Sequence, residues 1–271
     1  MKNSIASILV VAAFVAACGR APSPENAMQV ALPSRSELES VARMRVVFAH
    51  QSVGNNILEG VRTIAKRENV PLRIDQTRSD TSTEPGILHF MVGHNGAPET
   101  KIEDFKQTIG AQAFGNVDVA LMKFCFVDFD ADTDPAKLAT DYETLIDTLQ
   151  RDQPATRFIA VTVPLETLQT GVRAWIKRVL GRAPGGYASN ARRYAFNEAL
   201  RHHYTPSQLF DLAHAESSGG GSAQTYTFNG ATAEALDPAL SADGAHLNPN
   251  GEVAVASALI RALAAAPPER H

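Results

Sequence analysis

Short apolar runs alternate along this chain with longer segments in which apolar residues recur every three or four positions. The apolar runs predict strands, at 45–49, 72–75, 117–126, 157–163 and 208–212. The periodic segments predict helices, at 56–66, 136–150, 192–202 and 251–265. Because strands and helices alternate over the whole length, we expect an α/β fold, a three-layer α/β/α sandwich with a parallel, flavodoxin-like sheet.

Two further segments depart from this alternation. Residues 165–180 carry apolar side chains at helical spacing, including the single tryptophan, Trp175. They predict an amphipathic helix whose apolar face packs on the core, with a lid over a functional site as the alternative. Residues 217–229 contain the three glycines 219–221 and predict a mobile loop.

The first residues have the features of an export signal. Lys2 supplies a positive charge, residues 5–17 are mostly apolar, and the stretch is too short to span a membrane as a mature helix. The following Val-Ala-Ala-Cys sequence, which ends at Cys18, resembles the lipobox of bacterial lipoproteins. We therefore expect residues 1–17 to be a lipoprotein signal peptide and Cys18 to be lipidated. The alternative is an ordinary secretory signal that happens to precede a cysteine.

The rest of the chain divides into a tether and one domain. Residues 18–44 comprise the lipidated cysteine and a Pro/Ser-rich tether, and residues 45–265 suffice for one large α/β domain. The net charge of −4 is spread without a basic block, which argues against nucleic acid as a partner. The lipobox resemblance implies a membrane partner through the lipid and a bacterial cell-envelope location. Gly19 after the cysteine favours the outer membrane, facing the periplasm, in a Gram-negative cell.

Cys125 is the second of two cysteines, so it has no internal disulfide partner once Cys18 carries lipid. Its apolar neighbours Met122, Phe124 and Phe126 predict that the thiol is buried. The alternative, a cysteine nucleophile, lacks a neighbouring group that would lower the thiol pKa.

A serine, a histidine and an aspartate supply the candidate chemistry. Ser52 follows the first apolar run where a strand gives way to a helix, which places its hydroxyl at the rim of a sheet. Asp243 stands three residues before His246, close to the last helix. An aspartate in this relation can hold the imidazole in one tautomer while the other ring nitrogen accepts the serine proton. The three residues therefore predict a Ser52–His246–Asp243 triad.

In their order along the chain, these signals resemble the SGNH/GDSL hydrolase superfamily over most of residues 45–265. Ser52 occupies the position of that family's nucleophile, and Asp243-Gly-Ala-His246 matches its last block in residue type, spacing and position. Weaker similarities lie at 161–164, 194–197, 209–212 and 248–251. The resemblance implies a serine hydrolase of acyl esters with no cofactor and no metal.

The chain departs from the family pattern at two of the blocks. His50-Gln51-Ser52 replaces Gly-Asp-Ser, and residues 125–128 stand where Gly-x-Asn-Asp is expected. The resemblance then implies an oxyanion hole formed by the backbone N–H groups of Ser52 and Gly96, with Asn95 as the candidate for the missing amide. Losing one such donor typically lowers the rate about a hundred- to a thousand-fold.

Each candidate also has a purely structural interpretation. Ser52 is a favoured residue for capping a helix, and Asp243, Gly96 and Asn95 suit turns. For His246 the structural interpretation is an ordinary surface histidine. The histidines at 50, 89 and 94 lack the spacing of metal ligands, so we expect no metal site.

These observations together predict a lipid-anchored serine esterase. The substrate class is a small acyl ester or an acylated carbohydrate, which the family resemblance suggests. Two alternatives remain: an O-acyltransferase using the same site, and an SGNH-like binding protein with impaired catalysis. The departures at residues 51 and 127 favour the second alternative.

Overall fold

The computed structural model describes residues 31–219 and 221–265. The predicted signal peptide and Cys18 lie outside these residues. The centre is a six-stranded, wholly parallel sheet in the order β2-β3-β1-β4-β5-β6. Its strands are β1 (Arg45–His50), β2 (Ile74–Gln76), β3 (Gly86–Met91), β4 (Val119–Met122), β5 (Arg157–Val161) and β6 (Leu209–Phe210). The predicted α/β fold with a parallel sheet is confirmed, with β3 as a strand beyond the predicted set.

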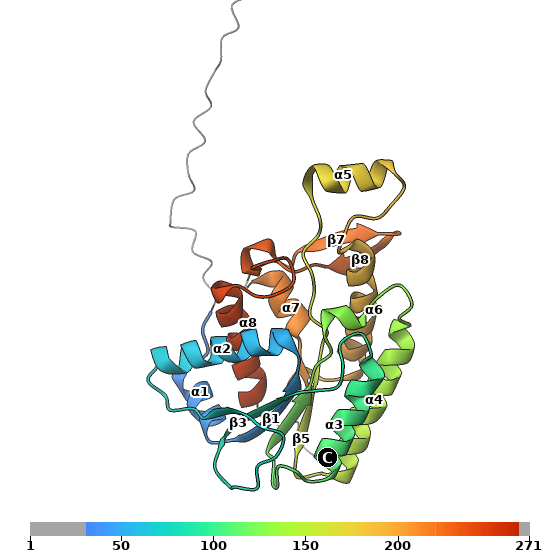
Figure 1. The fold of residues 1–271 in the computed structure, drawn as a ribbon. Helices are drawn as coiled ribbons and strands as arrows, with labels where there is room; N and C mark the ends of the chain where they lie inside the picture. The colour runs from blue at the N-terminus through green and yellow to red at the C-terminus, as the bar shows by residue number, and fades with distance from the viewer. Residues whose placement is uncertain (1–30, 220, 266–271) are drawn as a thin grey trace, which may run out of the picture.

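Helices cover both faces of the sheet (Figure 1). One face is covered by α1 (Arg35–Ala42), α2 (Ser52–Arg67), α7 (Leu212–Ser218) and α8 (Pro249–Ala264). The opposite face is covered by α3 (Pro98–Gly110), α4 (Pro135–Asp152) and α6 (Tyr187–His203). The helix α5 (Gly171–Val179) projects from these layers, and the antiparallel hairpin β7 (Thr225–Phe228) with β8 (Ala231–Glu234) packs against α6 and α7.

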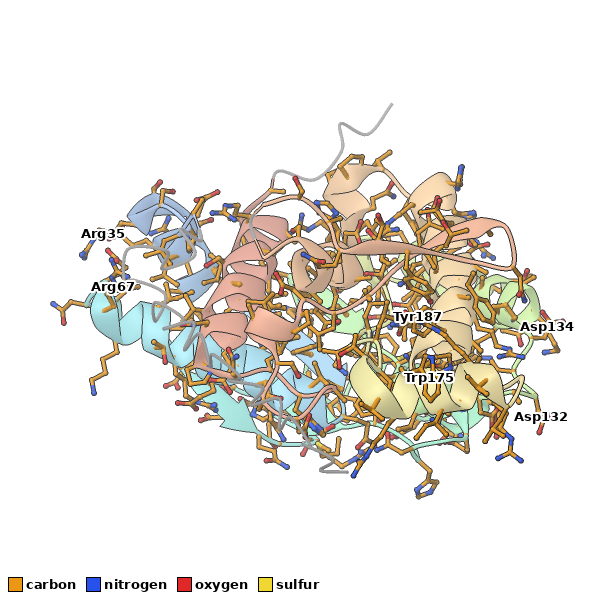
Figure 2. All side chains as sticks on the ribbon, turned by 90° about the horizontal axis from the view of Figure 1, so that it is seen from above. Arg35, Arg67, Asp132, Asp134, Trp175 and Tyr187 are labelled. Carbon is orange, nitrogen blue, oxygen red and sulfur yellow. The ribbon has the colours of Figure 1, made fainter. Side chains whose placement is uncertain are left out.

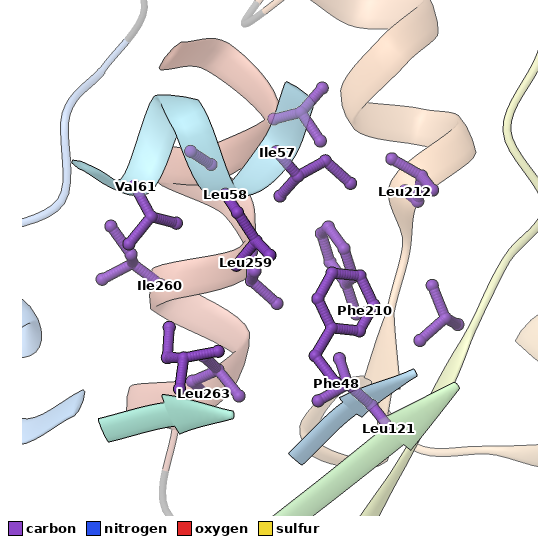
Figure 3. Close-up of a cluster of buried hydrophobic side chains, with 14 of the residues drawn as sticks. Phe48, Ile57, Leu58, Val61, Leu121, Phe210, Leu212, Leu259, Ile260 and Leu263 are labelled. Carbon is purple, nitrogen blue, oxygen red and sulfur yellow. The ribbon is translucent and has the colours of Figure 1, made fainter. Parts of the chain in front are cut away.

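Strand β1 shows why the two cores form. Its side chains alternate, so that Val46 and Phe48 belong to one core while Val47 and Ala49 belong to the other, and all four are fully buried. Figure 3 shows the first core, in which Phe48 and its neighbours on other strands face apolar residues of α2 and α8. A strand covered on both faces is apolar at every position, which explains its continuous apolar sequence.

Helices α2 and α8 pack closely because Gly60 has no side chain. A Cβ atom at Gly60 would lie 2.0 Å from the Glu252 carbonyl oxygen. The same helix pair is joined by a hydrogen bond from the Asn56 side chain to the Glu252 carboxylate, at 3.0 Å. The contact fixes the beginning of α2, which carries Ser52, relative to the segment before α8, which carries His246.

Several predicted boundaries differ from the structure. The predicted tether contains α1, which Ser34 and Glu37 begin with a capping box and which buries Leu38 and Val41. Strand β4 ends at Met122 instead of residue 126, because the chain turns into a short 3-10 helix at Phe126–Asp128. Within the predicted loop at 217–229, residues 217–218 end α7 and residues 225–228 form β7.

The interpretation of residues 165–180 as a core-packed helix is wrong. The helix spans only Gly171–Val179, and of its residues only Ala174 is buried. Leu165 is buried, but it belongs to the segment before the helix. Periodicity predicts that a helix has an apolar face, while the partner of that face is set by the tertiary fold. Within the described residues, no helix is long and apolar enough to cross a membrane.

Candidate active site

Ser52 lies where ligands bind in open parallel sheets. It is the first residue of α2 and follows β1 after the single residue Gln51. Strands β3 and β4 lie on opposite sides of β1 in the sheet. The helices that follow β1 and β3, α2 and α3, cover opposite faces of the sheet, so the carboxyl end of β1 is a topological switch point. Such switch points form crevices at the carboxyl edge of a sheet. The fold therefore presents the Ser52 hydroxyl at that edge.

The structure brings the three predicted side chains together. His246 Nε2 lies 3.1 Å from Ser52 Oγ, and His246 Nδ1 lies 2.8 Å from Asp243 Oδ2. Both separations are within hydrogen-bond distance. The residue that caps α2 is Gln51, not Ser52, and it makes no side-chain capping bond. The Ser52 hydroxyl is thus directed at the imidazole rather than at its own helix.

Asp243 is held as a carboxylate. Its Oδ1 accepts hydrogen bonds from the backbone N–H groups of His246, at 2.8 Å, and Ala245, at 2.9 Å. These bonds, with the one to the imidazole, lower the pKa of Asp243 to about 2. A carboxyl with a lowered pKa stays ionised until the pH falls to that value. Asp243 is therefore negatively charged at any pH well above 2, and it can orient the imidazole through Nδ1.

An aromatic side chain supports the histidine from the neighbouring loop. The Phe126 ring meets the His246 ring edge to face, with centroids 5.7 Å apart and planes at 83°. The Phe126 carbonyl in turn accepts hydrogen bonds from the buried guanidinium of Arg193. The loop after β4 therefore fixes one side of the imidazole. The sequence does not indicate this role for Phe126, because an aromatic residue after an apolar strand carries no specific signal.

Gln51, which stands where the SGNH/GDSL pattern has an acidic residue, joins two loops. Its Nε2 donates to the carbonyl oxygens of Val92, at 2.7 Å, and Gly93, at 3.2 Å, just beyond β3. A carboxylate could not donate these bonds, so the amide suits its partners here. The substitution thus joins the segment before Ser52 to the loop that carries Asn95 and Gly96.

Two histidines beneath the site are neutral and face each other. His50 Nε2 lies 3.0 Å from His89 Nδ1, and His50 Nδ1 contacts the Gln51 carbonyl oxygen at 2.8 Å. Burial lowers the pKa of His50 to about 3 and that of His89 to about 4. A Cβ atom at Gly54 would lie 2.2 Å from the His50 ring, so glycine is required in the first turn of α2.

The two other predicted oxyanion donors differ: the N–H of Gly96 already has a protein acceptor, whereas the amide nitrogen of Asn95 has none in the described residues. The Gly96 N–H donates to Asp128 Oδ1 at 2.8 Å, so the amide expected to face an oxyanion is directed at a carboxylate instead. The Asn95 Oδ1 atom accepts from Lys101 Nζ at 3.0 Å. Within the described part of the chain, no protein acceptor engages the amide hydrogens of Asn95 or the backbone N–H of Ser52. Both groups therefore remain available to donate to an added oxygen.

A buried ion pair holds this loop. Lys101 Nζ lies 2.5 Å from Asp128 Oδ2, and both side chains are fully buried. The same carboxylate accepts the backbone N–H of Cys125 at 2.7 Å as well as that of Gly96. Asp128 therefore links the loop after β3 to the loop after β4. The sequence did not indicate this pair, because Lys101 and Asp128 are far apart and each is of a type normally found at the surface.

Lys101→Met is expected to lower the free energy of unfolding by about 3–5 kcal/mol, because it leaves the Asp128 carboxylate buried without a counter-charge. Urea denaturation of the two proteins measures the difference. The double variant Lys101→Met/Asp128→Asn should be more stable than Lys101→Met alone, since it removes the unpaired charge. An equally unstable double variant would contradict the ion-pair account.

Cys125 and Val127 both lie in the loop after β4, where the first is buried and the second is exposed. Cys125 is a free thiol and is buried, as the sequence predicts. Val127, at the position of the family's asparagine, is 41% exposed and offers no donor side chain. The structure therefore supplies no side-chain amide from this loop.

No protein family model matches the chain, and no curated protein matches it. Solved structures with a similar fold include a platelet activating factor candidate from Streptococcus pneumoniae, with 15% identity, TM-score 0.47, and coverage of 84% of this chain and 90% of the other. An SGNH hydrolase candidate from Slackia heliotrinireducens has 18% identity, TM-score 0.42, and coverage of 80% and 97%. A peptidoglycan O-acetylesterase has 13% identity, TM-score 0.41, and coverage of 66% and 46%. At these identities and scores, none of them defines the chemistry of this site.

Proposed function

We propose that this protein is a serine ester hydrolase of the SGNH/GDSL type. The observation that carries the proposal is the hydrogen-bonded series from Ser52 Oγ through the His246 imidazole to the Asp243 carboxylate. A nucleophile, a base and a group that orients the base are the parts that acyl transfer requires. Their position at the carboxyl end of β1 places them where an open α/β sheet binds ligands.

The proposed reaction has two halves. Ser52 Oγ attacks the ester carbonyl carbon, and His246 Nε2 accepts the hydroxyl proton while Nδ1–H remains bonded to Asp243. The tetrahedral intermediate then collapses, its alcohol leaves with the proton from His246, and the acyl group remains on Ser52. A water molecule attacks this acyl-enzyme with His246 again as base, which releases the carboxylic acid and restores the hydroxyl.

The developing oxyanion would be held by the Ser52 backbone N–H and the Asn95 side-chain amide. Both donors are without a protein acceptor in the described structure, and the first belongs to the positive end of the 16-residue helix α2. Lys101 fixes the carbonyl oxygen of the Asn95 amide, which leaves its nitrogen available to a ligand. Gly96 has no part in this proposal while its N–H is bonded to Asp128.

The alternative is an SGNH-like protein that binds acyl esters without turning them over. The bond from Gly96 to Asp128 and the valine at position 127 favour it, because each removes a donor that the family resemblance implies. The two functions differ in one measurable property. A hydrolase releases the alcohol of an acetyl or butyryl chromogenic ester repeatedly, whereas a binding protein releases none beyond the spontaneous rate.

The substrate class is a short acyl ester, with O-acetylated carbohydrate as the candidate that family resemblance suggests. The proposed test uses an acetyl chromogenic ester with and without a sugar alcohol as competing acceptor. A hydrolase gives acetate as its main product under both conditions. Predominant acetyl transfer to the sugar would assign the site to an O-acyltransferase, and no turnover at all would reject both enzymes.

We further propose that the protein is anchored in the bacterial cell envelope by lipid on Cys18, facing the periplasm from the outer membrane in a Gram-negative cell. The support is the apolar stretch at 5–17 and its Val-Ala-Ala-Cys end, which lie outside the described residues.

Cys18→Ser is expected to abolish lipidation, because the thioether requires the sulfur atom. The variant should accumulate as precursor or as an unlipidated exported form, and it should leave the detergent phase in a phase-partition experiment. Cys125→Ser is the matched control, which changes the other cysteine and should retain the lipid. Detergent partition of Cys18→Ser at the level of the natural protein would reject the anchor.

A further inference from the structure

Helix α5 exposes an apolar face that no other part of the described residues covers. Six large apolar side chains are exposed in the described part of the chain, and five of them belong to this segment, namely Val172, Trp175, Ile176, Val179 and Leu180. Their spacing places them on one stripe of the helix, with Trp175 64% exposed and Val172 73% exposed. Clustered exposed apolar side chains of this kind indicate an interaction surface.

The charged residues of this segment are all positive. Residues 171–182 contain Arg173, Lys177, Arg178 and Arg182 and no acidic residue. An apolar stripe with a tryptophan, flanked by cationic side chains, is typical of a helix that lies in the interface of a lipid bilayer. The same charges disfavour docking of α5 against a second copy of itself, since both partners would present cations.

The chain segments on either side of α5, at residues 167–169 and 185–186, are bonded to each other, and we call this pair of segments the base of α5. Gln169 N–H donates to the Gly185 carbonyl at 2.9 Å, and Gly185 N–H donates to the Gln169 side chain at 3.0 Å. A left-handed backbone at Gly186 (φ +85°) brings it against the Thr167 carbonyl oxygen, which a Cβ atom would approach to 2.5 Å. The two segments of this base therefore fix α5 as a projecting element.

The orientation of α5 leaves its stripe open to the outside. Ala174 is its only buried residue, so the apolar stripe faces away from the domain. Arg178 donates to the Tyr187 hydroxyl at 2.9 Å and lies over the Tyr187 ring, which holds this orientation. Figure 1 shows α5 projecting at one end of the molecule, and in the view from that end α5 lies in front of the domain and carries Trp175 (Figure 2).

The base of α5 adjoins the candidate site. The Thr167 N–H donates to the Gly244 carbonyl at 2.8 Å, and Gly244 immediately follows Asp243. A surface on which α5 rests would therefore lie at the same end of the molecule as the triad.

We propose that α5 docks this end of the protein on an anionic lipid bilayer. Trp175 and its apolar neighbours enter the headgroup region, and the exposed Arg173 and Arg182 contact the anionic lipid phosphates. The docking itself is independent of the ester chemistry. Its consequence, that the site acts on acyl esters held at a membrane surface, rests on the proposed function.

The emission of Trp175 tests this docking directly, because it is the chain's single tryptophan and reports on α5 whatever else attaches the protein to lipid. The full-length protein is titrated with vesicles of phosphatidylcholine alone and with vesicles containing equal parts of phosphatidylglycerol. We expect the emission to shift to shorter wavelength, and lipid-borne quenchers to reduce it, with the anionic vesicles.

Arg173→Gln/Arg182→Gln is expected to weaken the fluorescence-detected affinity for anionic vesicles about 25-fold, or about five-fold for each cation removed. The matched control Lys66→Gln/Arg67→Gln removes the same charge from exposed residues at the far end of α2 and should leave the affinity unchanged. Ser52→Ala should also bind normally, which separates docking from catalysis.

Three results would overturn the proposal. An unchanged Trp175 emission with both vesicle types would show that α5 does not enter lipid, which would favour a lid or a protein partner. An equal response to neutral vesicles would remove the role of the charges. A shift that grows with protein concentration in the absence of lipid would assign the stripe to self-association.

Discussion

Ser52→Ala should lower the hydrolysis of a chromogenic acetyl ester by at least about ten-thousand-fold, because the variant has no oxygen to form the acyl-enzyme. Ser52 is partly exposed at the start of α2, and its hydroxyl bonds to His246 rather than to the backbone. The alanine variant should therefore remain folded, as circular dichroism and urea denaturation can establish. The measurement is kcat/KM at equal amounts of folded protein.

Ser34→Ala supplies a matched control for this change. Ser34 caps α1 and accepts the backbone N–H of Glu37, so its loss is expected to cost about 1 kcal/mol of stability. It lies on a different helix from Ser52, and its removal should leave ester hydrolysis unchanged. Equal turnover by Ser52→Ala and the natural protein would rule out the serine mechanism and leave the binding protein as the better account.

His246→Ala should be about as damaging as Ser52→Ala, and the double variant should be hardly worse than either single variant. Residues that act in one step lose activity together, so their effects do not add. Asp243→Asn should also reduce kcat severely, because an amide can present its N–H group to Nδ1 and favour the wrong tautomer. The pattern of single and double variants is measured with the same ester.

The surface pair of His203 and Asp147 is the control for this second experiment. His203 Nε2 lies 3.0 Å from Asp147 Oδ2, which repeats the histidine–aspartate contact without a serine. His203→Ala should therefore retain full activity. A near-normal kcat for His246→Ala would contradict the proposed base, and additive losses in the double variant would contradict a shared catalytic step.

The sequence predicted the parallel sheet because its buried strands are continuous apolar runs, of which β1 is the clearest. Strand β3 was outside the predicted set. It contains the polar His89, which is buried because it bonds to His50 across neighbouring strands. A polar residue satisfied by a distant partner breaks the apolar pattern without breaking the strand.

The proximity of Ser52, His246 and Asp243 could be predicted because chain order and topology together decide it. Ser52 begins α2, the helix after the first strand. His246 precedes the last helix, α8, and α8 packs on α2. The status of Gly96 could not be predicted, since its N–H is taken by Asp128 in a loop contact with no local signal. The outward orientation of the apolar face of α5 could not be predicted either. The amphipathic pattern of a helix that packs on the core is the same as that of a helix whose apolar face points outward.

If His246 activates Ser52 as a nucleophile, a fluorophosphonate should modify Ser52 covalently. The protein is treated with the reagent, digested, and analysed by mass spectrometry to locate the modified residue. We expect one covalent adduct per molecule, on Ser52, which is lost in His246→Ala and absent from Ser52→Ala. An unmodified protein, or an adduct confined to another residue, would contradict it.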